Sequence, residues 1–308
     1  MREPIFPGGT TNDTENELLI SGSFHNQSTL VNSIQSLVNQ VSENQFQSYL
    51  THLVSYPTRF STSSFYEEAA TWTREILNEM GYTTSSETIH VNNADSQNVI
   101  ANKMGTNRDE EKHLIIITAH LDSVNHSGGP SSNAPGADDN GSGSAGVLEI
   151  ARVFKDIPVQ HDLRFILFGG EEQGLLGSKQ YVENLPTPDK NRIRAVINMD
   201  MIGKLNTSTP AVLIEGSPLS EELINGLKNV ASLYTELDVE VSLNPFDSDH
   251  VSFLNKGIPA VLTIEGEDSL NPNDHTANDT LEHIHYPLAL DILRMNIAYI
   301  ASQVTNLE

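Results

Sequence analysis

The stretch LRFILFGGEEQGLLGS, residues 163–178, contains the pattern that decides the fold. The run 163–168 is apolar apart from Arg164, and two glycines separate it from the adjacent acids Glu171 and Glu172. A short run that is apolar on both faces is typical of a strand with helices on each side of its sheet. The QGLLGS that follows favours the start of a helix. The stretch therefore predicts a buried strand whose C-terminal end carries two carboxylates.

Five further runs resemble this strand. They are NVIANKMG (98–105), HLIIITAHLDS (113–123), RAVINMDMIG (194–203), PAVLIEG (210–216) and IPAVLTIEG (258–266). The connecting segments 143–156, 173–184, 218–235 and 286–304 have helical periodicity. Alternating strands and helices predict an α/β fold with a mainly parallel, mixed sheet sandwiched between helices. Because no internal repeat or linker divides the pattern, we expect a single domain.

The sequence before this pattern predicts a helical scaffold. Apolar residues at helical spacing predict a first helix over 30–54. Ser64 and Glu67 form a capping-box pattern for a second helix, which should stop at Gly81. Trp72 lies on the apolar stripe of that helix and is expected in the core.

Composition excludes several classes of partner. The chain has 17 basic and 41 acidic residues, and a formal net charge of −24 repels nucleic acid and anionic membranes. The sequence contains no run of 18 apolar residues, the length that predicts a transmembrane helix. The first residues lack the pattern of a signal peptide. Zero cysteines exclude disulfides, thiolate metal ligands and a cysteine nucleophile. Residues 1–30 are polar and predict a loosely held arm, which leaves 31–308 as the domain.

Polar residues gather where the predicted strands end. His120 and Asp122 close one strand, Glu171 and Glu172 close another, and Asp200 closes a third. In a parallel sheet these ends meet at one edge, where ligands bind. Two loops offer further candidates: Asp138 and Asp139 in PGADDNGSG (135–143), and His275 and Asp279 in NDHTANDT (273–280).

These residue types indicate a metal site. Nitrogen and carboxylate donors without sulfur favour zinc, ahead of manganese, cobalt or iron. Two histidines and three acids exceed what one tetrahedral ion needs, but they fit two ions about 3.5–4 Å apart that share a carboxylate and a water. The residues alone leave open whether Asp138 or Asp139 supplies the shared carboxylate.

Six motifs in order resemble those of the secreted bacterial two-zinc aminopeptidases of the M28 class. They are AHLDS (119–123), PGADDNGSG (135–143), GGEEQGLLGS (169–178), NMDMIG (198–203), SDHVSFLNKGIPA (248–260) and DHTANDT (274–280). The resemblance begins near residue 55 with YPTRFSTSSFYEEAATW (56–72) and extends to about residue 305. It implies the zinc exopeptidase (phosphorylase/hydrolase-like) fold and two Zn²⁺ ions. It also implies peptide substrates with a free N-terminus, a monomer, and export from the cell.

The resemblance also implies a role for each metal ligand. His120 and Asp200 match the terminal ligands of one zinc, and Glu172 and His275 match those of the other. Asp139, counted back from Gly141 of its motif, matches the bridging carboxylate.

Other motif residues match supporting positions. Asp122 matches the acid that orients the ligand His120. Glu171 matches the general base, which takes a proton from the activated water and delivers it to the leaving amine. Asp249 and His250 match no ligand position, and we expect them to support the ligands.

The substrate pocket is less readable from the sequence. The family prefers leucine and other bulky apolar N-terminal residues, and Phe246, Phe253 and Leu254 are candidates for the pocket that holds them. Asp274 stands where some relatives have a tyrosine that stabilises the oxyanion, which puts that contribution in doubt here. Five histidines have no motif support and are expected to be ordinary: His113, His126, His161, His283 and His285.

Three other functions fit parts of the pattern. Glutaminyl cyclases share the fold and most motifs but bind one zinc, and the complete set of five ligands argues against them. A carboxypeptidase needs cationic groups for the substrate carboxylate, and no arginine cluster accompanies the motifs. A non-catalytic peptide-binding domain on this fold usually lacks a ligand or the base, and none is missing here.

Overall fold

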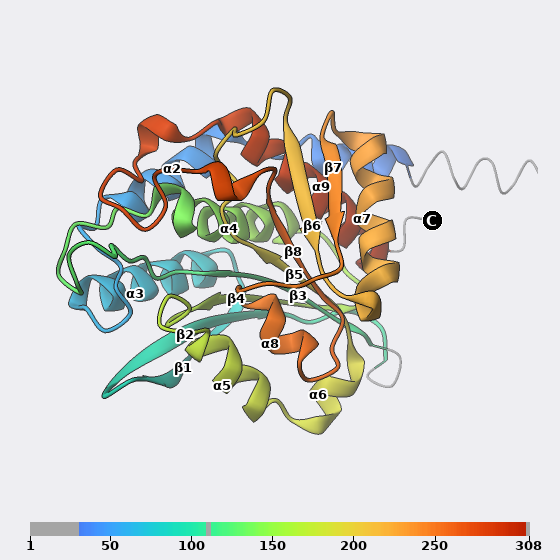
Figure 1. Cartoon of the computed structure of the whole chain (residues 1–308). Coiled ribbons are helices and arrows are strands. Elements are labelled where there is room, and N and C mark those ends of the chain that lie inside the picture. The colour runs from blue at the N-terminus through green and yellow to red at the C-terminus, as the bar shows by residue number, and fades with distance from the viewer. Residues whose placement is uncertain (1–30, 109–111, 306–308) are drawn as a thin grey trace, which may run out of the picture.

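The computed structural model describes residues 31–108 and 112–305, whose strands form one eight-stranded mixed sheet between two layers of helices (Figure 1). The strand order is β1-β2-β4-β3-β5-β8-β6-β7. The strands are β1 (Thr83–Val91), β2 (Ala94–Lys103), β3 (Leu114–His120), β4 (Asp162–Phe168), β5 (Ile193–Met199), β6 (Ala211–Glu215), β7 (Asp238–Ser242) and β8 (Ala260–Glu265). The predicted α/β class with a mixed sheet between helices is confirmed. The predicted arm over residues 1–30 lies outside the described residues.

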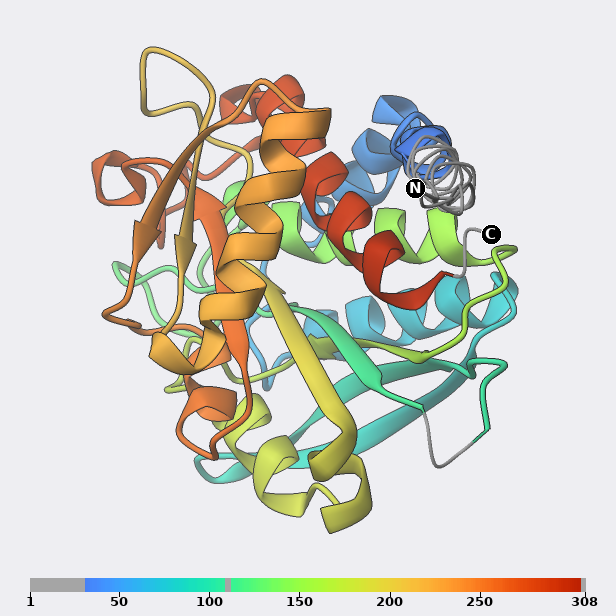
Figure 2. The same ribbon diagram turned by 90° about the vertical axis from the view of Figure 1, so that its right-hand side faces the viewer.

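Helices cover both faces of the sheet. Those on the upper side in Figure 1 are α2 (Glu43–Val54), α3 (Ser64–Glu79), α4 (Gly143–Phe154), α7 (Glu221–Tyr234) and α9 (Tyr286–Val304). Those on the lower side are α5 (Leu176–Asn184), α6 (Thr187–Arg192) and α8 (His250–Leu254). Figure 2 shows α9 lying between α7 and α4, and it packs against both. No helix among the described residues is long and apolar enough to cross a membrane.

The direction of the strands sets where the site forms. The four central strands, β4, β3, β5 and β8, run parallel to one another. On the two sides of this group, β2 pairs antiparallel with β4, and β6 pairs antiparallel with β8. The carboxyl ends of the central strands therefore meet at one edge, as the sequence predicted.

Strand β3 shows why the central strands are apolar on both faces. Ile115 and Ile117 lie in the larger core cluster together with residues of α2, α4 and α9. Leu114 and Ile116 lie in a second cluster on the other face, with residues of α5 and α8. Since side chains alternate between the two faces of a strand, helices on both sides leave no solvent-facing position for polar residues.

Two predictions for the helical scaffold were wrong in detail. The helix expected over 30–54 is interrupted, because residues 31–38 are helical and α2 begins only at Glu43. Ser42 caps the start of α2: its hydroxyl accepts from the Gln45 amide at 3.3 Å, while its own amide donates to Glu149 Oε1 at 2.6 Å. The cap of α3 is Ser63 and not Ser64.

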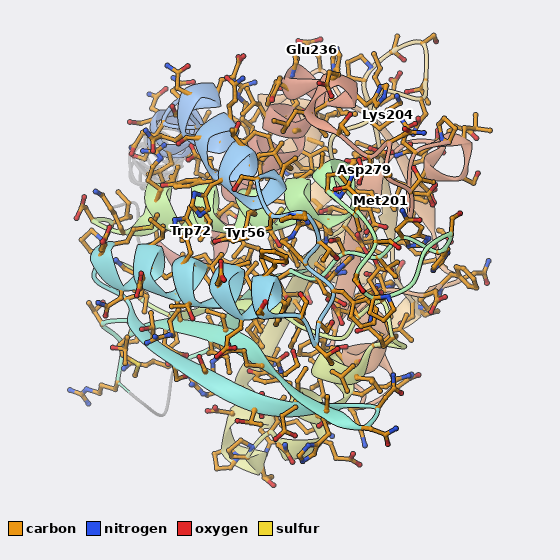
Figure 3. All side chains as sticks on the ribbon, turned by 90° about the vertical axis from the view of Figure 1, so that its left-hand side faces the viewer. Tyr56, Trp72, Met201, Lys204, Glu236 and Asp279 are labelled. Atoms are coloured by element: carbon orange, nitrogen blue, oxygen red, sulfur yellow. The ribbon has the colours of Figure 1, made fainter. Side chains whose placement is uncertain are left out.

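Trp72 of α3 packs against the larger core and is partly buried. Its ring stacks on His52 of α2 with centroids 3.9 Å apart, and His52 meets Tyr56 edge-on at 5.6 Å. Figure 3 labels Trp72 and Tyr56 at the two ends of this group. This aromatic group joins the two helices that precede the sheet.

Candidate metal centre

A pocket of about 370 Å³ opens where the central strands end. Its lining includes the two predicted histidine ligands and four of the predicted acids, namely His120, His275, Asp139, Glu171, Glu172 and Asp200. They come from the end of β3, the π-helical turn η2 (Ala137–Ser142), the turn after β4, the residue after β5 and the loop after β8. The fold thus brings together residues that are far apart in the sequence.

Asp139 lies between the two histidines. Its Oδ1 is 3.2 Å from His120 Nε2, and its Oδ2 is 3.0 Å from His275 Nε2. Asp138 is engaged elsewhere, since its Oδ1 accepts from the Gly203 amide at 2.8 Å. Because each oxygen of Asp139 faces a different histidine, Asp139 and not Asp138 has the position of a bridging carboxylate.

Two further acids flank this histidine pair on opposite sides. Asp200 Oδ1 lies 3.1 Å from His120 Nε2, and Glu172 Oε2 lies 3.1 Å from His275 Nε2. Glu171 Oε2 is 3.9 Å from His120 Nε2, beyond hydrogen-bonding distance. The result is two overlapping donor sets that share Asp139, with Glu171 close to one of them.

Asp122 connects two strand ends. Its backbone carbonyl lies 3.1 Å from His120 Nδ1, so we assign the ring proton to that nitrogen, which leaves Nε2 free for a ligand. Its carboxylate accepts from the amides of Glu171 and Glu172 at 3.3 Å each and from Ser61 Oγ at 2.7 Å. Asp122 therefore holds the histidine through its backbone carbonyl and the turn that carries the two glutamates through its carboxylate.

The turn after β4 depends on its glycines. Gly170 has φ +67°, a conformation that other residues rarely adopt. A Cβ on Gly169 would lie 2.3 Å from the Tyr66 hydroxyl. The helix predicted to start within QGLLGS is confirmed, since α5 starts at Leu176. The backbone amides of Glu171 and Glu172 both donate to the carboxylate of Asp122.

Two further residues support the site: Asp279, which the sequence offered only as a candidate without a role, and Arg59, which it did not single out. Asp279 accepts from the amides of Asp138 and Asp139, each at 2.9 Å, so it holds the backbone of the bridging acid. Burial and the neighbouring Asp138 raise the pKa of Asp279 to about 8. The motifs 56–72 and 273–280 contained both residues but gave no sign of these contacts.

Arg59 is fully buried beneath the site. Burial lowers the pKa of its guanidinium to about 10, which leaves it charged at neutral pH. The guanidinium donates to four backbone carbonyls, those of Leu53 (3.0 Å), Leu121 (2.8 Å), Pro135 (2.6 Å) and Gly136 (2.8 Å). Arg59 therefore ties the segment that carries Asp122 to the loop that carries Asp139.

The SDH motif supports the site through its serine. Ser248 Oγ donates to Asp200 Oδ2 at 2.7 Å and accepts from Asn198 Nδ2 at 2.8 Å. Asp249 and His250, which we expected to be the supporting pair, are fully buried next to it, and burial raises the pKa of Asp249 to about 7.

The apolar wall of the pocket differs from the prediction. Phe246 lines the pocket and is 77% exposed. Phe253 does not line it, because it packs in the second core cluster between Phe168 and Tyr181, and Leu254 packs against the same cluster. The wall comes instead from Met201, Leu213, Leu262 and Ile264.

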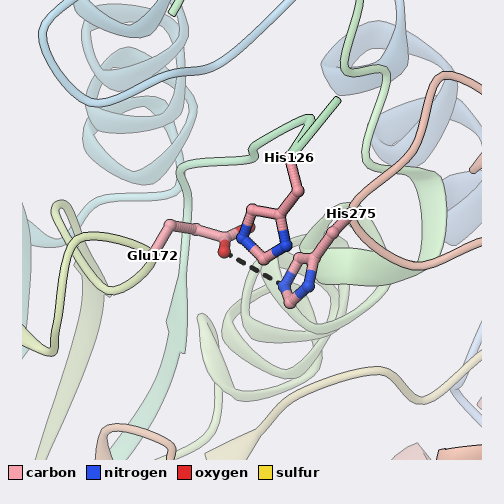
Figure 4. Close-up of side chains that lie close together, drawn as sticks. All are labelled: His126, Glu172 and His275. Atoms are coloured by element: carbon pink, nitrogen blue, oxygen red, sulfur yellow. Dashed lines mark ion pairs between the residues drawn. The ribbon is translucent and has the colours of Figure 1, made fainter. Parts of the chain in front are cut away.

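His126, expected to be an ordinary histidine, lines the pocket. Its ring centroid is 4.2 Å from that of His275, and the two planes are tilted by 45°. Figure 4 shows both rings beside the carboxylate of Glu172. The other histidines without motif support, namely His113, His161, His283 and His285, are not among the described residues that line the pocket.

Carboxylates dominate the charge of the pocket, whose described lining contains neither lysine nor arginine. Burial, then the charge of Asp139, raises the pKa of Glu172 to about 8, and burial raises that of Glu171 well above its usual range. Glu172 Oε1 is buried and accepts no hydrogen bond from the described residues. Clustered oxygen and nitrogen donors with an excess of negative charge fit divalent cations, zinc above all.

The histidines compensate part of this charge through protonation. Burial lowers the pKa of His120, but the charges of Asp200 and Glu171 outweigh it and raise the pKa well above its usual range. Hydrogen bonds to Asp139 and Glu172 raise the pKa of His275 to about 11. In return, the two histidines outweigh burial and lower the pKa of Asp139.

The metal-free protein should lose stability as the pH rises. The pKa of Glu172 is about 8 in the folded chain and 4.5 for an unperturbed glutamate, which represents the unfolded chain. Between these two pH values the folded chain holds a proton that the unfolded chain has lost. His275, raised from 6.5 to about 11, acts in the same direction at higher pH. The denaturant concentration at the midpoint of unfolding, measured on protein freed of metal with a chelator, should therefore decrease as the pH rises from about 5 to about 9. The decrease should be smaller for the metal-bound protein. A midpoint of the chelated protein that rises over this range would contradict the shifts.

The sequence of this chain is similar to those of known peptidases. The model of the family described as Peptidase family M28 matches residues 98–300. Aminopeptidase YwaD of Bacillus subtilis is 34% identical over 195 residues, which cover 62% of this chain and 41% of YwaD. The probable leucine aminopeptidase of Trichophyton verrucosum is 28% identical over 275 residues, which cover 86% of this chain and 74% of the fungal protein. The match thus spans less than half of YwaD but about three quarters of the fungal protein.

Solved structures share the fold. A zinc aminopeptidase from Bacillus subtilis, BSAP, superposes with a TM-score of 0.76 at 18% identity, over 86% of this chain and 96% of BSAP. The glutaminyl cyclase of Porphyromonas gingivalis superposes with a TM-score of 0.68 at 21% identity, over 85% of this chain and 99% of the cyclase. Since enzymes of two activities have this fold, the distinction between them must come from the residues of the site.

Proposed function

This chain belongs to peptidase family M28, and from that premise we propose that it is a two-zinc aminopeptidase that releases the N-terminal residue of peptides. The observation that carries the proposal is the position of Asp139, with one oxygen toward His120 and the other toward His275. Asp200 completes the first donor set and Glu172 the second. Two complete sets favour the aminopeptidase over a single-zinc glutaminyl cyclase.

The chemistry follows from the donor sets and from Glu171. Bound zinc lowers the pKa of a coordinated water from about 15.7 toward 7 and polarises the scissile carbonyl. Glu171 would take the proton of the attacking water on Oε2 and deliver it to the leaving amine. Asp122 holds this base in place, because it accepts the backbone amide of Glu171 at 3.3 Å.

The charge of the pocket supports recognition of an amine. Beyond the proposed ligands and the base, four more acids line it: Glu215, Asp247, Asp268 and Asp274. Negative charge favours a cationic N-terminus and disfavours a C-terminal carboxylate, which argues against a carboxypeptidase. The apolar wall formed by Leu213, Leu262 and Ile264, with the exposed Phe246 at its side, fits a bulky apolar residue such as leucine.

The remaining parts of the proposal concern the whole molecule. We propose that residues 31–308 form a single catalytic domain, that the enzyme is a monomer, and that it acts outside the cell, as the resemblance to exported enzymes implies. Light scattering of the purified protein and activity in the culture supernatant test the last two.

The experiment that tests the function combines metal analysis with a substrate panel. The purified protein should contain about two zinc ions per chain and hydrolyse leucine anilide. It should lose this activity to a chelator, regain it with zinc, and spare N-acetylated peptides. One bound ion together with cyclisation of N-terminal glutamine would establish the cyclase instead. A zinc-loaded protein that is inert toward every substrate would favour a peptide-binding domain.

A further inference from the structure

We propose that His126 is an additional ligand of the metal ion bound by Glu172 and His275. With the shared Asp139, that ion would have four protein ligands, whereas the ion at His120 and Asp200 would have three. The inference rests on the proposed two-zinc function and adds to it a residue outside the ligands that the family resemblance supplied.

The first argument is the position of the donor atoms. Ligand atoms of His126, Glu172 and His275 all lie within 4.8 Å of one another, a spacing at which one ion can contact all three. Figure 4 shows the two rings and the carboxylate converging. The rings are tilted by 45° at a centroid distance of 4.2 Å, and so are not stacked in parallel.

The second argument is that the backbone holds His126 in this place. Its amide donates to the carbonyl of His275 at 3.1 Å, which joins the loop after β3 directly to the loop that carries the predicted ligand. Asn125 fixes the loop on each side of this contact, because its side chain donates to the Asn133 carbonyl at 2.8 Å and accepts from the Ser127 amide at 2.9 Å. The position of His126 is thus built into the hydrogen bonds of the loop.

The third argument is that the imidazole of His126 is available. The side chain is exposed, and its ring makes no hydrogen bond or ion pair with any of the residues described. A histidine held by its backbone at the mouth of an acidic pocket, with a ring that contributes nothing to protein hydrogen bonding, is suited to bind a ligand from the pocket. Divalent metal is the ligand for which the adjacent side chains are arranged.

The consequence is that the two metal positions differ. Two imidazoles and two carboxylates complete the four-coordinate set typical of a tightly held zinc. The position at His120 keeps three protein ligands and so has room for a water or substrate atom. Glu171 is near this position, since its Oε2 is 3.9 Å from His120 Nε2. The ion at Glu172 and His275 would therefore be the more tightly held, and the ion at His120 and Asp200 would be the one at which the reaction takes place.

The test compares zinc affinities in the full-length protein. Zinc dissociation constants are measured for the unchanged protein and for His126→Ala by competition with a chromophoric chelator, and visible spectra are recorded with Co²⁺ in place of zinc. His126→Ala should raise the dissociation constant of one of the two zinc ions by more than about tenfold and leave that of the other unchanged. It should also alter the absorption spectrum of the Co²⁺-bound protein. The matched control is His90→Ala, which removes an exposed histidine of β1 outside the described lining of the pocket and should change neither constant.

Three outcomes would overturn the inference. Two unchanged dissociation constants and an unchanged Co²⁺ spectrum in His126→Ala would show that the ring does not bind metal. A change in KM or kcat with both zinc affinities intact would assign His126 to the substrate instead. If the unchanged protein binds fewer than two ions, the two-zinc function itself fails, and this result is separable because it appears without any substitution.

Discussion

The Glu171→Gln variant should lose about 10³-fold in kcat while binding as much zinc as the unchanged protein. Glutamine has the same shape, so the backbone amide can still donate to Asp122, but its side chain cannot take a proton at neutral pH. Glu171 Oε2 is 3.9 Å from His120 Nε2, whereas Asp139 and Asp200 approach that nitrogen to 3.2 and 3.1 Å. The loss should therefore concern proton transfer and not the binding of metal.

The neighbouring substitution Glu172→Gln provides the control for this prediction. It makes the same change in the same turn, but Glu172 Oε2 lies 3.1 Å from His275 Nε2 within a proposed donor set. We expect this variant to lose zinc and to recover activity in part when zinc is added in excess. Metal content by mass spectrometry and steady-state kinetics separate the two variants. A Glu171→Gln protein with full turnover, or with depleted zinc, would refute the assignment of the base.

The Arg59→Met variant should be less stable to unfolding by about 4 kcal/mol. Methionine fills much of the same space but donates no hydrogen bond, so the buried carbonyls that receive the guanidinium lose their donor. Each buried acceptor left without a partner costs about 1–3 kcal/mol, although water can reach some of them. Because natural domains are stable by about 5–15 kcal/mol, this single change removes a large part of the total.

Arg164→Met is the matched comparison for Arg59. Arg164 is only partly buried and donates to the side chains of Asn102, Tyr181 and Asp189, so we expect a loss of about 1 kcal/mol. Urea unfolding of the zinc-loaded proteins measures both values. If Arg59→Met costs no more than Arg164→Met, Arg59 does not anchor the loops in the way its contacts indicate.

The parts of the fold that the sequence predicted are those where burial dictates the residue type. The central strands β3, β4, β5 and β8 are buried on both faces and therefore read as apolar runs. The predicted helix over 286–304 coincides with α9 for the same reason, because most of its residues are buried. The resemblance to family M28 is also confirmed, because the family model matches residues 98–300. It could be predicted because the motifs at the strand ends are short local patterns that are recognisable in a single sequence.

Elements at the edges of the sheet could not be predicted in this way. β1, with the sequence TTSSETIHV, and β7, with DVEVS, are mostly polar and exposed, and no apolar run marks them. Their conformation comes from pairing, β1 with β2 and β7 with β6, so the information lies in the neighbouring strand.

Site residues that follow strands could be predicted from the sequence, whereas those whose position depends on the conformation of a loop could not. Asp139 and its partners stand at fixed positions after strands or within motifs, and the fold brings them together. His126 lies in a loop without periodicity, and its position depends on a backbone contact with His275 that no local pattern encodes. Phe253 shows the converse, because an apolar residue beside a motif suits a pocket or a core equally well, and three-dimensional packing decides.

The strand order also determines when a chain under synthesis can complete its metal centre. β8 lies between β5 and β6 in the sheet, although the chain forms both of these before it, and His275 follows β8. A chain that has left the ribosome only as far as α8 carries the acids of the site without His275. Such a chain has His120 and His126 among several repelling carboxylates, and its sheet lacks the central strand β8. We therefore expect the protein to bind its second metal ion only after most of the chain has been synthesised.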